Sequence, residues 1–142
     1  MNILIIDDNS LFIDGLAYVL NKLAGQVTIT ASNRVKDAIR KLEQQTNYDL
    51  ILLDLNIPDG NGLDFIQHFS AAELCIPVII LSSEQKPHLI LQALDWGAMG
   101  FIPKSYSSQQ MLCALQAVLD GLVYIPTEIK HQLDRLAATN HH

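Results

Sequence analysis

The feature that most restricts the fold of this chain is a set of short, uninterrupted apolar runs. Four occur, at Ile3–Ile6, Leu50–Leu53, Val78–Leu81 and, more weakly, Met99–Ile102. Continuous apolar runs of this length are typical of strands that are buried on both faces of a sheet. A fifth segment, Val27–Ala31, alternates with threonines and is typical of an edge strand. The sequence therefore predicts five strands, one of them at an edge.

Between these runs, apolar residues recur at helical spacing. Strand and helix alternate five times, which predicts an α/β fold, with an open parallel sheet of five strands covered by five helices in three layers. We expect Ser10 and Asn33 to cap helix N-termini, and Gly25, Gly97 and Gly121 to end helices. The apolar stripes are Phe12, Leu16, Val19, Leu20 and Leu23; Val35, Ala38, Ile39 and Leu42; Leu63, Ile66 and Phe69; Ile90, Ala93 and Leu94; and Leu112, Leu115, Leu119 and Leu122.

Composition and charge restrict the classes of function. The chain has 142 residues, of which 49% are apolar and 17% charged, enough for one domain with a real core. Its net charge of −6 would repel phosphate backbones, so we expect no direct nucleic-acid binding by these residues. The apolar start has no basic stretch and breaks at Asp7, which argues against a signal peptide. No apolar run is long enough for a membrane helix. Cys75 and Cys113 are far apart and lack CxxC spacing. We expect a soluble, cytoplasmic protein with free thiols.

The sequence changes in character after Gly121. Residues 1–122 are predicted to form the main domain, and residues 123–142 a linker or an extra amphipathic helix. We interpret His141 and His142 as a tag remnant rather than a metal site. A proline in this tail can begin a helix. The apolar residues that follow it are spaced at i, i+4 and i+7, and they are Ile129, Leu133 and Leu136.

Polar side chains stand where the predicted strands end. In an open α/β sheet, ligands bind at the carboxyl ends of the strands. Because parallel strands end at one edge, these side chains are expected to converge there. They are Asp7 and Asp8 after the first strand, Asp54 after the third, Ser82 and Ser83 after the fourth, and Lys104 after the fifth.

Three carboxylates in one place require a cation or a raised pKa. Two of them ~5 Å apart repel by roughly 3 kcal/mol at an effective dielectric near 20. Oxygen ligands favour a hard ion, so we expect Mg²⁺, with Mn²⁺ as an alternative. Lys104 offers a charge, and Ser82 a hydroxyl, to the oxygens of a phosphoryl group. Asp54 is therefore predicted to be a phosphoryl acceptor, since these groups can neutralise the transition state.

Each residue also has a plainer interpretation. Asp7 and Asp8 are common as helix N-caps, Asp54 as a turn residue, and Lys104 as a surface lysine. Serines such as Ser82 are frequent at strand ends. Their joint placement at strand ends favours the chemical interpretation.

Four motifs carry a resemblance to a known family: "IIDDN", "LILLDLNIPDGNGLDFI", "PVIILSS" and "GAMGFIPKS". In order and spacing they resemble the receiver domains of two-component response regulators, over about residues 1 to 122. The resemblance implies a doubly wound, flavodoxin-like sheet of order 2-1-3-4-5. It also implies that Asp54 accepts a phosphoryl group from a histidine-phosphorylated sensor kinase. Mg²⁺ would be held by Asp7, Asp8, Asp54 and the backbone carbonyl of Asn56.

The resemblance further implies a switch. Ser82 would follow the phosphoryl group, Lys104 would pair with it, and Phe101 would be the switch aromatic that packs inward into the vacated space. The chain departs from the family pattern at Ser83, where alanine is common. It departs again after Lys104, where Ser105 replaces the usual proline, so the loop there is expected to be built differently.

The segments "GFIPKS" and "DGLVYIP" resemble the LuxR-type subfamily, whose members carry a C-terminal helix-turn-helix domain. That resemblance implies a transcriptional output through a DNA-binding domain that this sequence lacks. We expect either a piece of a longer regulator or a stand-alone receiver, with a sensor kinase or phosphotransfer protein as partner. Homodimerisation on phosphorylation is plausible through the fifth helix or the tail.

One alternative keeps the same nucleophile. An aspartyl phosphohydrolase of the haloacid-dehalogenase type also uses a strand-end Asp, Mg²⁺ and a lysine, but would turn over rather than act as a switch. Such enzymes need an acid two residues after the nucleophile, where this chain has Asn56. A third alternative is a degenerate receiver that only docks, which the full set of site residues argues against.

Overall fold

A five-stranded parallel sheet forms the centre of the computed structural model, which describes residues 1–23, 25–57, 60–71, 75–83 and 86–139. Its strand order is β2-β1-β3-β6-β7. This is the 2-1-3-4-5 order in terms of the five long strands, so the predicted sheet and its order are confirmed. The strands are β1 (Asn2–Ile6), β2 (Thr28–Ser32), β3 (Leu50–Asp54), β6 (Val78–Ser82) and β7 (Gly100–Pro103).

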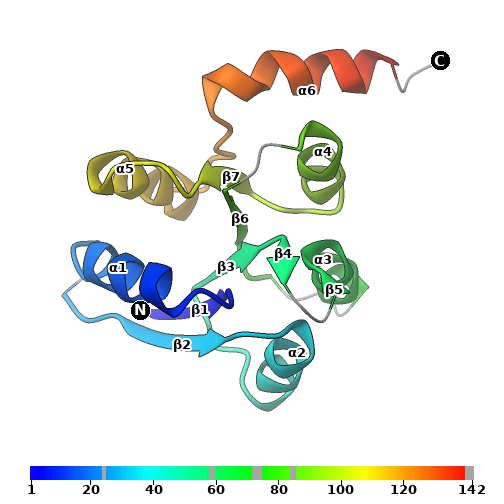
Figure 1. Ribbon diagram of the computed structural model, residues 1–142. Helices are drawn as coiled ribbons and strands as arrows, with labels where there is room; N and C mark the ends of the chain where they lie inside the picture. The colour runs from blue at the N-terminus through cyan, green and yellow to red at the C-terminus, as the bar shows by residue number, and fades with distance from the viewer. Residues whose placement is uncertain (24, 58–59, 72–74, 84–85, 140–142) are drawn as a thin grey trace.

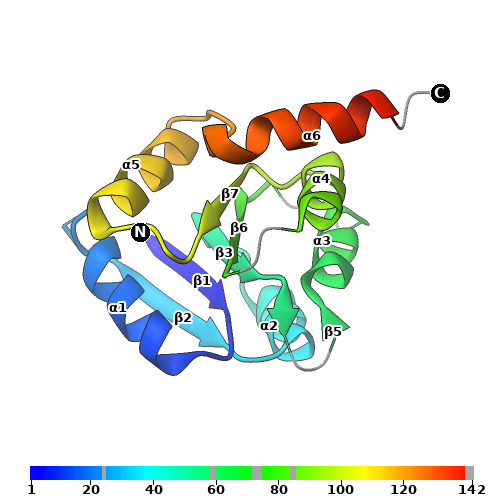
Figure 2. The same ribbon diagram turned by 45° about the horizontal axis from the view of Figure 1, so that its top comes forward.

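Helices cover both faces of the sheet, as Figures 1 and 2 show. One face carries α1 and α5, and the other carries α2, α3 and α4. The described residues contain six helices rather than the five predicted, because the tail adds α6. The helices are α1 (Ser10–Leu20), α2 (Val35–Gln44), α3 (Gly62–Ala71), α4 (Pro87–Asp95), α5 (Ser108–Leu119) and α6 (Thr127–Thr139).

The pattern of burial explains why the strands read as continuous apolar runs. Every residue of Ile3–Ile6 and Leu50–Leu53 is fully buried, because these central strands face a helical layer on each side. β2 pairs only with β1, and of its five residues only Ser32 is buried, as expected for an edge strand. A small hairpin, β4 (Asn56–Ile57) with β5 (Gly60–Asn61), follows β3 and has no counterpart in the predicted elements.

The helix ends correct three of the predictions. Asn9, not Ser10, is the N-cap of α1, and its side chain accepts a hydrogen bond from the Phe12 N–H. The residue at the N-cap of α2 is Arg34, not Asn33, and it makes no side-chain cap. Gly97 and Gly121 have positive φ angles just past α4 and α5, so both act as predicted helix ends. Gly25 does not, because α1 ends at Leu20.

The tail forms a helix that packs on the domain. α6 lies against α4, with Ile129 fully buried and Leu133 almost so (Figure 2). Both belong to the core cluster on the α2, α3 and α4 side of the sheet. The boundary at residue 122 remains a prediction, and the expected tag remnant at 141–142 lies outside the described residues. Within the described chain, no helix has the length and apolar character needed to cross a bilayer.

The segment before α6 is attached to the free edge of β7. The Phe101 N–H donates to the Tyr124 carbonyl and the Tyr124 N–H donates to the Met99 carbonyl, each at 3.0 Å. The hydroxyls of Tyr124 and Tyr106 are also 3.0 Å apart. A Cβ at Gly100 would lie 2.8 Å from the Tyr124 carbonyl oxygen, so this close approach requires glycine. The pairing covers an edge that would otherwise expose unpaired backbone groups.

Candidate functional site

The strand ends bring the predicted site residues to one edge of the sheet. Asp7 follows β1, and its N–H donates to the carbonyl of Ser32 at the end of β2. Asp54 ends β3 and is in register with Leu81, one residue before Ser82. Lys104 follows β7, and its N–H donates to the Ser82 carbonyl at 3.0 Å. The parallel register therefore aligns residues that are far apart in the chain.

Lys104 joins two of the carboxylates. Its Nζ lies 2.8 Å from Asp7 Oδ2 and 2.9 Å from Asp54 Oδ2. The side chains of Asp7 and Asp54 are 0% and 7% exposed, and that of Lys104 is 13% exposed. A single ammonium thus bridges two carboxylates in a poorly solvated place, where electrostatic interactions are stronger than in water.

Local turns fix the remaining oxygens of both carboxylates. Asp7 Oδ1 accepts the Asn9 N–H at 2.9 Å, and Asp54 Oδ1 accepts the Asn56 N–H at 3.0 Å. Asp7 and Asp8 are therefore not the N-caps of α1, which excludes their plainer interpretation. Each carboxylate is held at one oxygen by its own turn and presents the other to the site.

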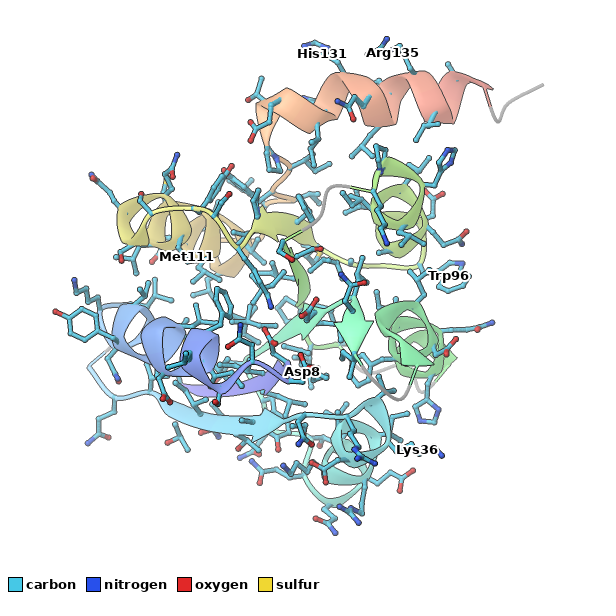
Figure 3. All side chains as sticks on the ribbon, viewed as in Figure 1. Asp8, Lys36, Trp96, Met111, His131 and Arg135 are labelled. Carbon is cyan, nitrogen blue, oxygen red and sulfur yellow. The ribbon has the colours of Figure 1, made fainter. Side chains whose placement is uncertain are left out.

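The three acids form a group that suits a divalent ion. One oxygen each from Asp7, Asp8 and Asp54 lies within 4.8 Å of the others. Asp7 Oδ2 is buried and has the Lys104 ion pair but no hydrogen bond, so it retains capacity for a cation. Asp8 is exposed and carries its carboxylate at the solvent-facing side of the cluster (Figure 3). An oxygen-only set with an open side fits Mg²⁺, which keeps several waters.

Burial and charge shift the pKa values of the paired groups. Burial raises the pKa of Asp54 above its ordinary value, although the Asn56 N–H and Lys104 oppose this. Burial alone would lower the pKa of Lys104, but the contacts with Asp7 and Asp54 outweigh it and raise that pKa. The ammonium therefore stays charged at neutral pH. One cation against three acids leaves the site with a net negative charge when all three are ionised.

The predicted switch residues are both buried. Ser82 is 3% exposed at the end of β6, while Ser83 beside it is exposed. Phe101 is already 0% exposed and belongs to the cluster that includes Ile129 and Leu133 of α6. If Phe101 acts as the predicted switch, its ring is therefore already buried before it moves. Its starting state is a buried ring in the core cluster that α6 helps to form.

One residue that contacts the site was predicted from the sequence only as part of the apolar stripe of a helix. Phe12, on α1, has its ring centroid 4.7 Å from Lys104 Nζ. Its position in the apolar stripe gave no sign of this contact, because its partner Lys104 is distant in the sequence. The role of the Asn56 carbonyl as a metal ligand stays a prediction. The Lys104–Ser105 bond, like all peptide bonds in the described residues, is not cis.

Comparison with known proteins decides the family. Residues 3–116 match the family described as "Response regulator receiver domain". The chain belongs to this family. The predicted resemblance is confirmed, and the receiver domain, a signalling module of two-component systems, covers most of the sequence. This match favours a receiver over the haloacid-dehalogenase alternative, for which Asn56 was already the wrong residue.

Relatives of this receiver domain include transcription regulators. It is 37% identical over 127 residues to the glycerol metabolism activator of Pseudomonas putida, covering 89% of this chain and 58% of the relative. The chain thus spans little more than half of that protein. It is 30% identical to a LuxR family DNA-binding response regulator from Silicibacter pomeroyi, with a TM-score of 0.78 and coverage of 90% and 98%. A LuxR family response regulator from Aurantimonas sp. SI85-9A1 shares the fold, at 21% identity, with a TM-score of 0.84 and coverage of 96% and 97%.

Proposed function

We propose that this receiver domain is a phosphorylation switch whose acceptor is Asp54. The observation that carries the proposal is the bridging of Asp7 and Asp54 by the Lys104 ammonium, beside the third acid Asp8. A buried carboxylate paired with a lysine and flanked by two further acids is the arrangement that phosphoryl transfer to a carboxylate needs. Nothing in a purely structural ion pair calls for the two extra acids.

The carboxylate oxygen of Asp54 is the proposed nucleophile. Its second oxygen is held by the Asn56 N–H, so the attacking oxygen is the one that now contacts Lys104. Attack forms an O–P bond to Asp54 and breaks the P–N bond of a phosphohistidine, or the P–O bond of an acyl phosphate. The leaving group keeps the bonding electron pair: a carboxylate leaves as the anion, whereas the imidazole nitrogen of histidine takes a proton from water. Lys104 is then placed to contact a phosphoryl oxygen in place of the lost carboxylate charge.

Asp7, Asp8 and Asp54 are the residues proposed to hold Mg²⁺, with the carbonyl of Asn56 as the fourth protein ligand. The ion, or Mn²⁺ in its place, would neutralise charge on the transferring phosphoryl oxygens. For the chain itself, this means that Lys104 must release Asp7 when the ion binds. The ammonium would keep its contact on the Asp54 side of the site.

The proposed output is a change in surface rather than a released product. Ser82 ends β6 one residue after the register partner of Asp54, and its carbonyl accepts the Lys104 N–H, which supports a role for its hydroxyl beside the phosphoryl group. We propose that Ser82 follows the phosphoryl group and that Phe101, beneath α6, responds by repacking. Such a domain accumulates one phosphoryl group per chain, unlike a turnover enzyme.

The proposed partner is a sensor histidine kinase or a phosphotransfer protein, with homodimerisation as a possible consequence. The DNA-binding regulator from Silicibacter pomeroyi and the activator from Pseudomonas putida support a transcriptional role for the whole protein. With its net charge of −6, the receiver itself would leave DNA contacts to another domain.

The decisive test is the intact mass after treatment with acetyl phosphate and Mg²⁺. Wild type should gain about 80 Da once, the mass of one phosphoryl group. Asp54→Asn should gain nothing, and Asp14→Asn, an exposed acid on α1, should behave as wild type. Labelling of Asp54→Asn at the wild-type rate, or no labelling of wild type, would contradict the proposal. Omitting Mg²⁺ should abolish most of the reaction.

A further inference from the structure

The ammonium of Lys104 has a third neighbour besides its two carboxylates. The ring of Phe12 lies with its centroid 4.7 Å from Nζ, within the range of a cation–π contact. The Lys104 side chain is only 13% exposed, so the ring replaces water around the charge. Asp7 and Phe12, at the start of α1, and Asp54, at the end of β3, thus surround the ammonium.

The position of the ring follows from the start of α1. Asn9 caps this helix by accepting the Phe12 N–H at 3.1 Å, so the cap that follows Asp7 and Asp8 also fixes the backbone of Phe12. The same helix start therefore carries two proposed metal ligands and the aromatic ring. Lys104 arrives from the opposite side of the site, after β7.

The charges at the site explain why such a ring matters. When a divalent ion takes the oxygen of Asp7, the ammonium loses one of its two ion pairs and is repelled by the ion. A flexible lysine could then turn outward to solvent. The face of an aromatic ring attracts a cation without competing for the metal ligands, so Phe12 can retain Lys104 beside Asp54.

We propose that Phe12 is a positioning residue that holds the Lys104 ammonium at Asp54 while a divalent ion occupies the acids. It does not touch the reacting atoms, and it acts only through Lys104. This inference rests on the proposed phosphoryl transfer to Asp54, and it adds a residue on α1 that sets the rate.

The test compares Phe12→Leu, which keeps apolar bulk but removes the ring, with Phe12→Tyr, which keeps the ring. The chain offers a matched control in Tyr18→Leu, because Lys22 Nζ also lies 4.7 Å from the Tyr18 ring but outside the site. Phosphorylation by acetyl phosphate with Mg²⁺ should be roughly three- to tenfold slower in Phe12→Leu. Phe12→Tyr should stay within about twofold of wild type, as should Tyr18→Leu.

Two further measurements separate positioning from packing. In a Lys104→Met background, Phe12→Leu should cause no additional loss of rate, whereas a general packing defect would still slow the reaction. In protein labelled with ¹³C at the lysine ε carbons, the Lys104 ε protons should be shifted upfield by the ring. That shift should disappear in Phe12→Leu and persist in Phe12→Tyr, and the signal is assigned by its loss in Lys104→Met.

Equal rates for wild type and Phe12→Leu, equal losses for the leucine and tyrosine variants, or a Lys104 shift that survives in Phe12→Leu would each overturn the proposal. If wild type takes no phosphoryl group, the proposed function fails instead. The lysine shift still tests the contact between Phe12 and Lys104 in that case, because it requires no phosphorylation.

Discussion

Replacing Lys104 by methionine should make the site bind Mg²⁺ more tightly while making it a poorer phosphoryl acceptor. The ammonium lies 2.8 Å from Asp7 Oδ2 and 2.9 Å from Asp54 Oδ2, and both acids are among the three proposed to hold the metal. It therefore competes with the ion for the same ligands. Methionine retains the apolar stem of the side chain and removes only the charge.

The size of the effect follows from the geometry. Lys104 Nζ lies 2.8 Å from Asp7 Oδ2, and Mg²⁺ binds oxygen at about 2.1 Å, so an ion on that oxygen would be within about 5 Å of the ammonium in its present position. A charge of +2 and a charge of +1 at that distance repel by roughly 1.7 kcal/mol at the dielectric of water, and by more in a drier site. Protonation of an unpaired acid would offset part of this gain. We expect the dissociation constant for Mg²⁺ to fall by roughly 5- to 20-fold.

Isothermal titration with Mg²⁺ at pH 8 and constant ionic strength measures this directly. Lys22→Met is the matched control, because it removes the same charge from a lysine on an aromatic ring at the other end of α1. The metal-free Lys104→Met protein should also lose about 1–3 kcal/mol of stability, since buried Asp7 loses its counter-ion, and Mg²⁺ should restore it. An unchanged or weaker affinity in Lys104→Met would show that the ammonium does not occupy the metal oxygens in solution.

Two further predictions concern stability. Gly100→Ala should lower the free energy of unfolding, measured by urea titration, by about 1–3 kcal/mol. The reason is that the added Cβ would lie 2.8 Å from the Tyr124 carbonyl oxygen. An unchanged free energy of unfolding would mean that the segment before α6 does not pair with β7 in solution. Asp37→Asn should lower stability at pH 7 by about 1 kcal/mol or less, because ion pairs with Lys41 and Arg40 lower the pKa of Asp37 from 3.8 to about 2 at a partly exposed site. Because the pKa of Asp37 is lowered on folding, its carboxylate stabilises the folded protein above pH 3.8, and this stabilisation is lost as the pH falls through about 2. The melting temperatures of wild type and Asp37→Asn should therefore converge toward pH 2. A difference in melting temperature that stays constant with pH would contradict this origin.

The sheet and the site edge were predictable because both depend on patterns within single segments. A strand buried on both faces leaves an uninterrupted apolar run, as at Leu50–Leu53, and a parallel sheet places the following polar residues at one edge. The prediction therefore located Asp7, Asp54 and Lys104 from strand ends alone. Prediction and structure agree best where one physical rule, the alignment of strand ends, determines the position of a residue.

The remaining features depend on pairings between distant segments. Phe12 is one of several apolar residues in its helix, and only the arrival of Lys104 from β7 distinguishes it. Gly100 reads as an ordinary strand residue until Tyr124 approaches it. The N-cap of α1 was misassigned by one residue because Asn9 and Ser10 are both good capping residues, and it is Asn9 that accepts the Phe12 N–H. The N-cap of α2 was also misassigned by one residue, and the residue there, Arg34, makes no side-chain cap.

The position of α6 changes how a phosphorylation signal would leave this domain. Phe101 sits at zero exposure in a cluster with Ile129 and Leu133, while its own N–H is bound to the Tyr124 carbonyl. We therefore expect repacking of Phe101 to be coupled to the core cluster that contains Ile129 and Leu133 of α6. Packed interfaces of this kind respond by shifting between arrangements rather than by gradual deformation. The C-terminal helix thus shares a core cluster with the residue proposed to switch, and the segment before the helix is hydrogen-bonded to that residue, so a signal from Asp54 would have a route to α6 through the described fold.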